Sequence, residues 1–344
     1  MWQFCEFWSL LGQMDQVAPV PASRDRVSAE ALLRREIAAR RSSNARRAVA
    51  TALRADDRFA ELELGHAIKC MADRRVFSAT WRGQDAIVKH VVTADRDARI
   101  SAMRDEILAV RTLMSQGRLR VADHLVSSPE AGILVTERAP GVSLTRTLMR
   151  AEPVRRARLL LDAGRWLRRY CSARRDFRPF DPATMLMPPL NLSDNLAAED
   201  RDRVAFLEGY VAAKSAEFAG APVLYAASHG DFIARNLHFS AGDFWGFDLD
   251  HETWMPIARD AAHFLTMLQL RDKTGKTEFH YGIDAADYWA FLDSGAVPAR
   301  ELDSILPIFL AQSMLAEIPL PDKPKHSLLL RLRLMIDGFR RQVG

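Results

Sequence analysis

Two acidic positions and an asparagine lie close together in a stretch that is otherwise rich in large apolar residues. Residues 229–250 read HGDFIARNLHFSAGDFWGFDLD, where Asn236 follows Asp231 by five positions and Asp248 follows Asn236 by twelve. A carboxylate buried among Phe, Trp and Leu is costly unless it is paired or binds something. The spacing fits a catalytic loop, a short hairpin and a metal-binding acid at the end of the hairpin, and it suggests a bound cation.

A lysine and a glutamate upstream offer charges that complement this stretch. Lys89 lies among apolar residues in a strand-like segment, and Glu106 lies on the helical segment that follows. A lysine held by a glutamate from a neighbouring helix can aim a fixed positive charge at phosphates. Taken alone, Lys89 reads better as a lysine on an edge strand, and it is the stretch at 229–250 that favours the phosphate-binding interpretation.

The elements that must position these residues are a small sheet and a larger helical part. Alternating patterns predict a meander of strands, two of them joined by a turn at RGQD, and apolar residues at steps of three and four predict a helix after the third strand. Beyond residue 141 the pattern is mainly helical, and a long helix rich in Ala, Leu and Arg precedes the sheet. The predicted strands are 67–70, 75–81, 86–91, 124–128 and 132–137, and the two predicted helices are 29–53 and 100–116.

Composition limits the class of protein. The chain has 344 residues, of which 48% are hydrophobic, enough to fill the cores of two lobes or of one large domain. Cys5, Cys70 and Cys171 form no CxxC pair and no disulfide framework, which predicts a reducing compartment and no structural zinc. The aromatic segment 1–14 lacks the basic residues of a signal peptide and is too short to cross a bilayer, and its helical spacing fits an interfacial anchor or a packed helix.

Positive charge is concentrated in one segment, although the net charge is only +4. Residues 150–178 contain ten arginines against three acidic residues. This segment either faces solvent or attracts an anionic partner such as a phosphorylated lipid surface. It has few interleaved aromatic side chains, so we do not expect nucleic acid as a partner.

The stretch that carries the acids resembles the motif of a known family. The sequence is similar to the aminoglycoside phosphotransferase and choline kinase-like family, small-molecule relatives of the protein kinases, in which HGDxxxxN is followed by an Asp after a short strand. His229, Gly230, Asp231 and Asn236 match the loop, and GFDLD at 246–250 matches the second part.

The resemblance covers residues 61–270 and implies an α+β, two-lobed protein-kinase-like fold. In that fold, residues 1–60 would form a helical N-terminal extension. Residues 61–138 would form an N-lobe with a small antiparallel sheet and one helix, and residues 139–344 a larger, mainly helical C-lobe.

The same resemblance implies roles for single residues. Asp231 would accept or orient the proton of the acceptor hydroxyl, while Asn236 and Asp248 would hold Mg²⁺ against the phosphates of ATP. Lys89 would pair with the α- and β-phosphates, braced by Glu106.

Further roles concern the hinge and the loop. The backbone of Thr136 to Arg138 would bind the adenine as the hinge between the lobes. Asp260 would steady the catalytic loop, and His229 would orient that loop rather than act as a base. Asp250 stays open between a metal partner, an acceptor-binding group and no role.

The segment between the first two strands departs from the protein kinases. CMADRRVF at 70–77 contains no glycine, the residue that in protein kinases lets the backbone approach the phosphates. Asp73 would repel a triphosphate unless it points away, and Arg74 or Arg75 would compensate for it at the nucleotide.

Two further departures favour a small-molecule acceptor. Gly230 stands where protein kinases carry an arginine that receives an activation-loop phosphate, and eleven residues separate Asp248 from Asp260, too few for a long peptide-docking segment. The acceptor-pocket candidates are Glu252, Trp254, Asp260 and the segment 279–293.

The sequence therefore predicts a phosphotransferase with an alcohol group as acceptor. It would move the γ-phosphoryl group of Mg-ATP to a hydroxyl of an aminoglycoside, a sugar or an amino alcohol. Two alternatives stay open, a kinase of a glycolipid or lipopolysaccharide sugar at a membrane and a kinase-like binding module with weak catalysis. We expect a cytoplasmic protein, with peripheral contact to the inner face of a membrane as the alternative. Within 279–293, Tyr281, Trp289 and Phe291 fit a hydrophobic core better than a cation-binding cage.

Overall fold

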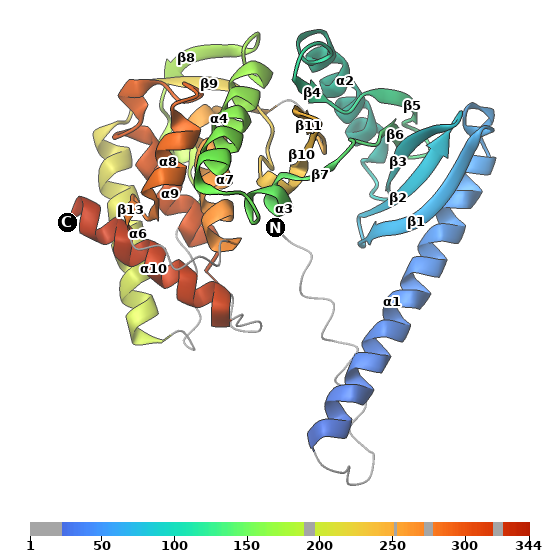
Figure 1. The fold of residues 1–344 in the computed structure, drawn as a ribbon, viewed down its shortest axis with the longest axis horizontal. Helices are drawn as coiled ribbons and strands as arrows, with labels where there is room; N and C mark the ends of the chain where they lie inside the picture. The colour runs from blue at the N-terminus through green and yellow to red at the C-terminus, as the bar shows by residue number, and fades with distance from the viewer. Residues whose placement is uncertain (1–22, 189–196, 251–252, 272–277, 319–325) are drawn as a thin grey trace.

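The computed structural model consists of a sheet half and a helical half (Figure 1). The aromatic segment 1–14 and the candidate Glu252 lie outside the residues that it describes. Among the described residues, no helix combines the length and the apolar character needed to cross a membrane. The structure describes residues 23–188, 197–250, 253–271, 278–318 and 326–344.

The sheet half is built on a five-stranded antiparallel sheet with the strand order β1, β2, β3, β6, β5. Arg82 and Gly83 alone connect β2 to β3, and their φ angles of 51° and 77° fit the turn that suits a two-residue hairpin. This confirms the predicted turn and the predicted meander. β1 begins earlier than predicted because Leu62 already pairs with Trp81. The bounds are β1 Leu62–Cys70, β2 Arg74–Trp81, β3 Gln84–Val91, β5 His124–Ser128 and β6 Ile133–Glu137.

Different helices cover the two faces of this sheet. α1 (Ser23–Arg54) packs its last turns on the face that carries Val88, and α2 (Arg96–Met114) covers the face that carries Val91. Because side chains alternate along a strand, Lys89 shares the face of Val91. Both helices confirm the sequence-based prediction and begin a few residues earlier. The first part of α1 extends past the sheet (Figure 1).

The helical half confirms the prediction made for the chain beyond residue 141. α7 (Ile257–Arg271) packs against α9 (Ile305–Ala316), and nearly every residue of α9 is buried, as expected for a helix that is apolar on all sides. The predicted α+β, two-lobed arrangement is therefore confirmed. The other helices of this half are α3 Leu144–Leu148, α4 Pro153–Tyr170, α5 Pro182–Met185, α6 Ala198–Glu217, α8 Ala285–Leu292 and α10 His326–Val343.

Short strands frame the segment that carries the acidic residues. β9 (Pro222–Ser228) leads into it, and the hairpin of β10 (Leu237–Ser240) and β11 (Asp243–Gly246) follows it. β11 also pairs in parallel with β4 (Leu119–Val121), which precedes β5 in the chain. The remaining short elements are β7 Val142–Ser143, β8 Arg175–Pro179, β12 Thr253–Pro256, β13 Phe279–His280, β14 Ile283–Asp284, η1 Asp57–Phe59, η2 Ala234–Asn236 and η3 Ala299–Glu301.

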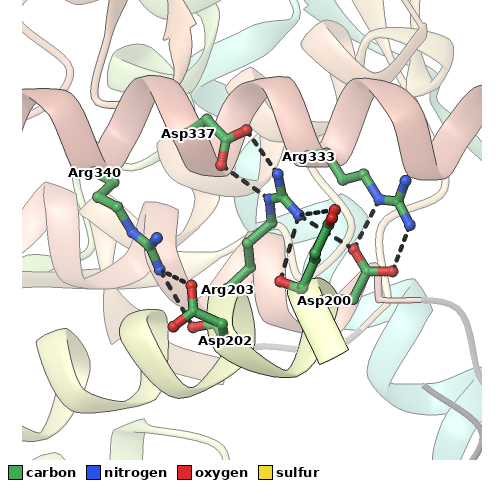
Figure 2. Close-up of polar contacts among 7 residues, drawn as sticks. Asp200, Asp202, Arg203, Arg333, Asp337 and Arg340 are labelled. Atoms are coloured by element: carbon green, nitrogen blue, oxygen red, sulfur yellow. Dashed lines mark hydrogen bonds and ion pairs between the residues drawn. The ribbon is translucent and has the colours of Figure 1, made fainter. Parts of the chain in front are cut away.

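A network of Arg and Asp side chains fastens the last helix, α10, to α6 (Figure 2). Arg203 of α6 donates to both carboxylate oxygens of Asp337, each at 2.9 Å. Arg333 of α10 donates to both oxygens of Asp200, each at 2.7 Å. The side chain of Asp200 is only 7% exposed, so this pair is shielded from solvent, unlike most surface ion pairs.

Replacing Asp200 by Asn should destabilise the fold, because Arg333 and Arg203 then face a neutral group in a shielded position. We expect the free energy of unfolding in urea to fall by about 2 kcal/mol. Asp202→Asn is the matched control, since Asp202 pairs with Arg340 at 2.9 Å but is 68% exposed. The control should lose about 0.5 kcal/mol or less. Equal losses in the two variants would show that the shielded pair does not hold α10.

Candidate active site

The loop 229–236 follows β9 and is held by a buried carboxylate from α7. Asp260 is 3% exposed and accepts hydrogen bonds from Ser228 Oγ (2.8 Å) and from the His229 amide (2.9 Å). Ser228 Oγ in turn accepts the Gly230 amide (3.1 Å), and Gly230 has a φ of 79°, which favours glycine. These bonds fix the start of the loop, as predicted for Asp260, and they remove Asp260 from the acceptor-pocket candidates.

Asp231 projects from this loop, and its two carboxylate oxygens face different partners. Oδ2 accepts a hydrogen bond from Nδ2 of Asn236 (3.1 Å) and lies 3.5 Å from the guanidinium of Arg235. Oδ1 faces Nε2 of His263, on α7, at 3.4 Å. Burial raises the pKa of Asp231, but the bonds from His263 and Asn236 and the charge of Arg235 outweigh burial and lower the pKa. The side chain, 45% exposed, is therefore ionised at neutral pH and accessible to a ligand.

His263 is a residue of this site that the sequence analysis missed. It follows Asp260 by three positions on α7, so both side chains lie on the same side of the helix. Once Asp260 was assigned to the loop, this spacing was the signal that could have found His263.

The hairpin of β10 and β11 brings Asn236 and Asp248 together. Leu237 pairs with Gly246, and the Phe247 amide donates to the Asn236 carbonyl (3.2 Å). Asp248 has a φ of 63°, a left-handed conformation that non-glycine residues seldom adopt and that marks constrained positions. The register of the hairpin thus brings the backbone at Asn236 next to the backbone that leads into Asp248.

Lys89 of β3 bonds to Asp248 and so connects the sheet to the hairpin. Its Nζ lies 2.6 Å from Oδ1, and the lysine side chain is 11% exposed. Burial raises the pKa of Asp248, but the charge and hydrogen bond of Lys89, followed by the charges of Arg74 and His229, lower it to about 2. An unfolded Asp titrates near about 3.9. The stability from this pair is therefore complete above that value and is lost as the pH falls towards 2.

The donor atoms at this point fit a hard divalent cation. Both hydrogen bonds of the Asn236 side chain in the described part of the chain use Nδ2, which leaves Oδ1 as a ligand. With a carboxylate oxygen of Asp248, it provides the oxygen donors that Mg²⁺ prefers. Among the described residues, no cluster of three or more His, Cys, Asp or Glu side chains offers an alternative metal site.

Glu106 does not brace Lys89, contrary to the prediction. Its carboxylate is 2% exposed and is bound by two N–H groups of Arg174 (2.6 and 2.7 Å) and by the hydroxyl of Tyr170. Burial and the charge of Glu106 raise the pKa of Tyr170, which keeps this hydroxyl protonated as a donor. The guanidinium of Arg174 donates to both oxygens of the Glu106 carboxylate, which was predicted to bond to Lys89. Glu106 therefore ties α2 to the end of α4.

Arg74 and Arg75 lie on opposite faces of the sheet, so only Arg74 shares the face of Lys89. Arg74 is paired with Val91 on that face, and its charge helps to lower the pKa of Asp248. Arg75 pairs with His90, whose pKa is lowered to about 4 by burial first and then by the charge of Arg75. Arg75 thus points away from the nucleotide site predicted for it, because alternate residues of β2 face opposite sides.

The predicted hinge segment is already paired within the sheet. Thr136 has a partner residue on each neighbouring strand, β3 and β5. The amides of Glu137 and Arg138 donate to the carbonyls of Asp123 (2.8 Å) and Asp85 (3.1 Å). These two amides are not available to an adenine, contrary to the prediction, because β6 keeps its sheet pairing to its last residue.

His229 is packed among aromatic rings, which supports an orienting role. It is 2% exposed, and its ring centroid lies 5.8 to 6.0 Å from those of Trp166, Tyr170 and Phe232. Gly246 leaves room for this cluster, since a Cβ there would lie 2.0 Å from the Trp166 ring.

Comparison with solved structures identifies the fold that holds this site. The protein is similar to amicoumacin kinase hAmiN over 83% of this chain and 92% of that one, with a TM-score of 0.53 and 15% identity. It is similar to aminoglycoside phosphotransferase APH(4)-Ia over 86% and 100% (TM-score 0.53, 13% identity). It is also similar to a choline/ethanolamine kinase family protein from Mesorhizobium loti over 82% and 90% (TM-score 0.51, 18% identity). The chain has this kinase-like fold. No protein-family profile and no curated protein sequence matches it.

The residues expected at the acceptor side of this kinase-like fold are partly engaged elsewhere. The guanidinium of Arg178 lies 4.1 Å from the ring centroid of Trp254, so this ring already carries a cation on one face. Tyr281 and Phe291 are buried, as the core interpretation expected, whereas Trp289 is 43% exposed.

Replacing His263 by Ala should raise the pKa of Asp231, because the bond from His263 is the largest of the interactions that lower it. The measurement is an NMR titration of the carboxyl carbons, with the signal of Asp231 assigned from the Asp231→Asn variant. His238→Ala is the control, since His238 bonds to the Ala139 carbonyl and should leave the pKa of Asp231 unchanged. An unchanged pKa in His263→Ala would contradict the contact.

Proposed function

We propose that the protein is a phosphotransferase that moves the γ-phosphoryl group of ATP to a hydroxyl of a small molecule. The observation that carries this proposal is the bond of Lys89 to Asp248 beside Asn236 and Asp231. Phosphoryl transfer uses a fixed lysine, oxygen ligands for a cation and a carboxylate that orients the acceptor. The fold shared with amicoumacin kinase and APH(4)-Ia supports the same conclusion.

The nucleotide phosphates would lie against the sheet face that carries Lys89 and Arg74. Asp248 and Oδ1 of Asn236 would hold Mg²⁺, which would neutralise part of the phosphate charge when bound. Lys89 and Arg74 add fixed positive charge from β3 and β2, which stabilises the charge that builds up on the phosphates during transfer.

Asp231 would orient the acceptor. The acceptor hydroxyl donates to its carboxylate, the hydroxyl oxygen bonds to the γ-phosphorus as the bond from that phosphorus to the ADP oxygen breaks, and the proton passes to Asp231. Because its pKa is lowered, Asp231 is a weak base, so most of its contribution is to hold the hydroxyl in line. Asn236 and His263 keep the carboxylate in place. The acceptor classes we propose are aminoglycosides, sugars and amino alcohols.

Asp231→Asn should slow transfer strongly without loss of nucleotide binding, because it removes the carboxylate that orients the hydroxyl and accepts its proton and leaves Lys89 and Asp248 unchanged. We expect kcat to fall about 100-fold or more, measured with γ-labelled ATP against a panel of aminoglycosides, sugars and amino alcohols. Asp176→Asn, at an exposed position on β8, is the matched control and should keep the activity. The proposal fails if the unaltered protein transfers phosphate to no member of the panel and gains no thermal stability with MgATP.

Lys89 and Glu106 should behave differently when each is replaced. Lys89→Met should weaken MgATP binding about tenfold or more, since it removes a charged donor to the phosphates. Glu106→Gln should leave this affinity nearly unchanged but lower the free energy of unfolding by about 2 kcal/mol, because Arg174 loses its buried partner. Calorimetric titration and thermal unfolding measure the two effects. Equal loss of affinity in both variants would show that Glu106 acts on Lys89 after all.

A further inference from the structure

Nine of the ten arginines in the segment 150–178 fall into two groups in the structure, and the tenth, Arg175, is exposed on β8. The first group contacts other residues of the protein, through ion pairs, bonds to backbone carbonyls or contact with an aromatic ring, and most of its members are at the surface. Its members are Arg156, Arg165, Arg168, Arg169, Arg174 and Arg178. Most of the charge seen in the sequence is therefore used to hold the fold together.

The second group gathers at the turn between α3 and α4. Arg150, Arg155 and Arg158 are exposed there together with Arg146 of α3, and none of the four forms an ion pair with another described residue. Glu152 is the one acidic residue in the sequence between positions 141 and 161. This turn therefore carries an unbalanced positive charge.

Two apolar side chains project from the middle of these arginines. Val154 is 85% exposed, the highest value among the large hydrophobic residues that are exposed in the described chain, and Met149 is 59% exposed, a value that Leu330 on α10 shares. We call the surface formed by Arg146, Met149, Arg150, Val154, Arg155 and Arg158 the basic turn. A scattered apolar residue on a surface is ordinary, but two highly exposed ones among unpaired arginines are not.

The basic turn is held firmly in this position. Arg156 donates to both oxygens of Asp287 on α8, at 2.7 and 2.5 Å, and to the Leu148 carbonyl at 3.2 Å. Leu148 is 1% exposed, so the residue before Met149 is anchored in the core. The exposure of Met149 and Val154 is therefore imposed by the packing around them.

We propose that the basic turn docks on an anionic membrane surface. Arginines near such a surface are attracted to its phosphate groups, and apolar side chains at the tip of the turn can enter the boundary between headgroups and acyl chains. A nucleic acid would attract the arginines equally well but would gain little from Met149 and Val154, and the turn offers no aromatic ring on which a base could stack. The membrane is thus the partner that uses both features.

Docking through this turn would bring the membrane close to the loop 229–236. α3 packs against η2, and Thr145 of α3 lines a small hollow together with Ile233, Ala234 and Arg235. One short helix therefore separates the docking surface from the loop that carries Asp231. The proposal concerns binding alone and does not depend on the proposed transfer reaction.

The test is sedimentation of the full chain with vesicles. The protein should bind vesicles of equal parts phosphatidylcholine and phosphatidylglycerol, should not bind phosphatidylcholine alone, and should be released by salt. Arg150→Glu with Arg155→Glu should weaken binding about tenfold or more, because two favourable charges become unfavourable. Arg175→Glu with Arg341→Glu makes the same change in net charge at exposed positions elsewhere and should leave binding within about twofold if the attraction is local.

The apolar contribution has its own pair of variants. Val154→Ser should weaken vesicle binding, whereas Leu330→Ser, at a residue that is 59% exposed on α10, should not. Circular dichroism and thermal unfolding check that each variant is folded.

Three results would overturn the proposal. The first is the absence of binding to the mixed vesicles, and the second is an equal effect of the two arginine pairs, which would indicate unspecific attraction by net charge. The third is tight binding of a single-stranded oligonucleotide that is lost in Arg150→Glu with Arg155→Glu and unaffected by Val154→Ser, which would assign the surface to nucleic acid.

Discussion

The bond between Lys89 and Asp248 is the constraint on which the candidate site depends. Lys89 is largely shielded from water, so its charge is tolerated only with a close partner. The bond requires β3 to present this lysine on the face opposite α1, and a slip of one residue in the pairing of β3 would move it to the other side. It also requires β11 to end at Gly246, so that Asp248 follows the hairpin at once. The ion pair between Lys89 and Asp248 can therefore form only if the strands of both sheets keep their observed register.

A second set of contacts, centred on Glu106, fixes where the loop 229–236 lies relative to α2. Glu106 holds Arg174 and Tyr170 at the end of α4, and the ring of Tyr170 stacks on Trp166 with centroids 5.3 Å apart. Trp166 in turn packs on Phe232 of the loop, 5.6 Å away. The glutamate that was expected to orient Lys89 therefore acts on the aromatic layer beneath the loop. The charge on the sheet face that carries Lys89 is set by Lys89, Arg74 and Asp248, without Glu106.

The sequence predicted those parts of the site that depend on local pattern. Alternation placed the strands and Lys89, and the spacing of Asp231, Asn236 and Asp248 identified a loop followed by a hairpin. What it missed depends on contacts between distant segments. Glu106 finds its partner 68 positions away, and no local pattern favours Arg174 over Lys89.

Two other errors have different causes. Thr136 to Arg138 were predicted to offer their backbone to an adenine, but the amides of Glu137 and Arg138 are already bonded to the neighbouring segments. A strand pattern in a sequence does not show at which residue backbone pairing with the two neighbouring segments ends. The error at Arg75 was avoidable, because alternation along β2 separates it from Arg74 once Lys89 is placed on one face.

Arginine shows most clearly why a run of charge in a sequence does not define a charged surface. A guanidinium can bind both oxygens of a carboxylate, so it suits buried ties between helices. Arg156, Arg203 and Arg333 each make such a tie, to Asp287, Asp337 and Asp200. Each of these acids lies more than 130 positions from its arginine in the sequence. Comparing the numbers of basic and acidic residues within a sequence segment therefore cannot reveal the pairing. Only the arginines that form no such ion pair present positive charge to a binding partner. They lie where neighbouring elements carry arginines but few acidic residues, as at the basic turn.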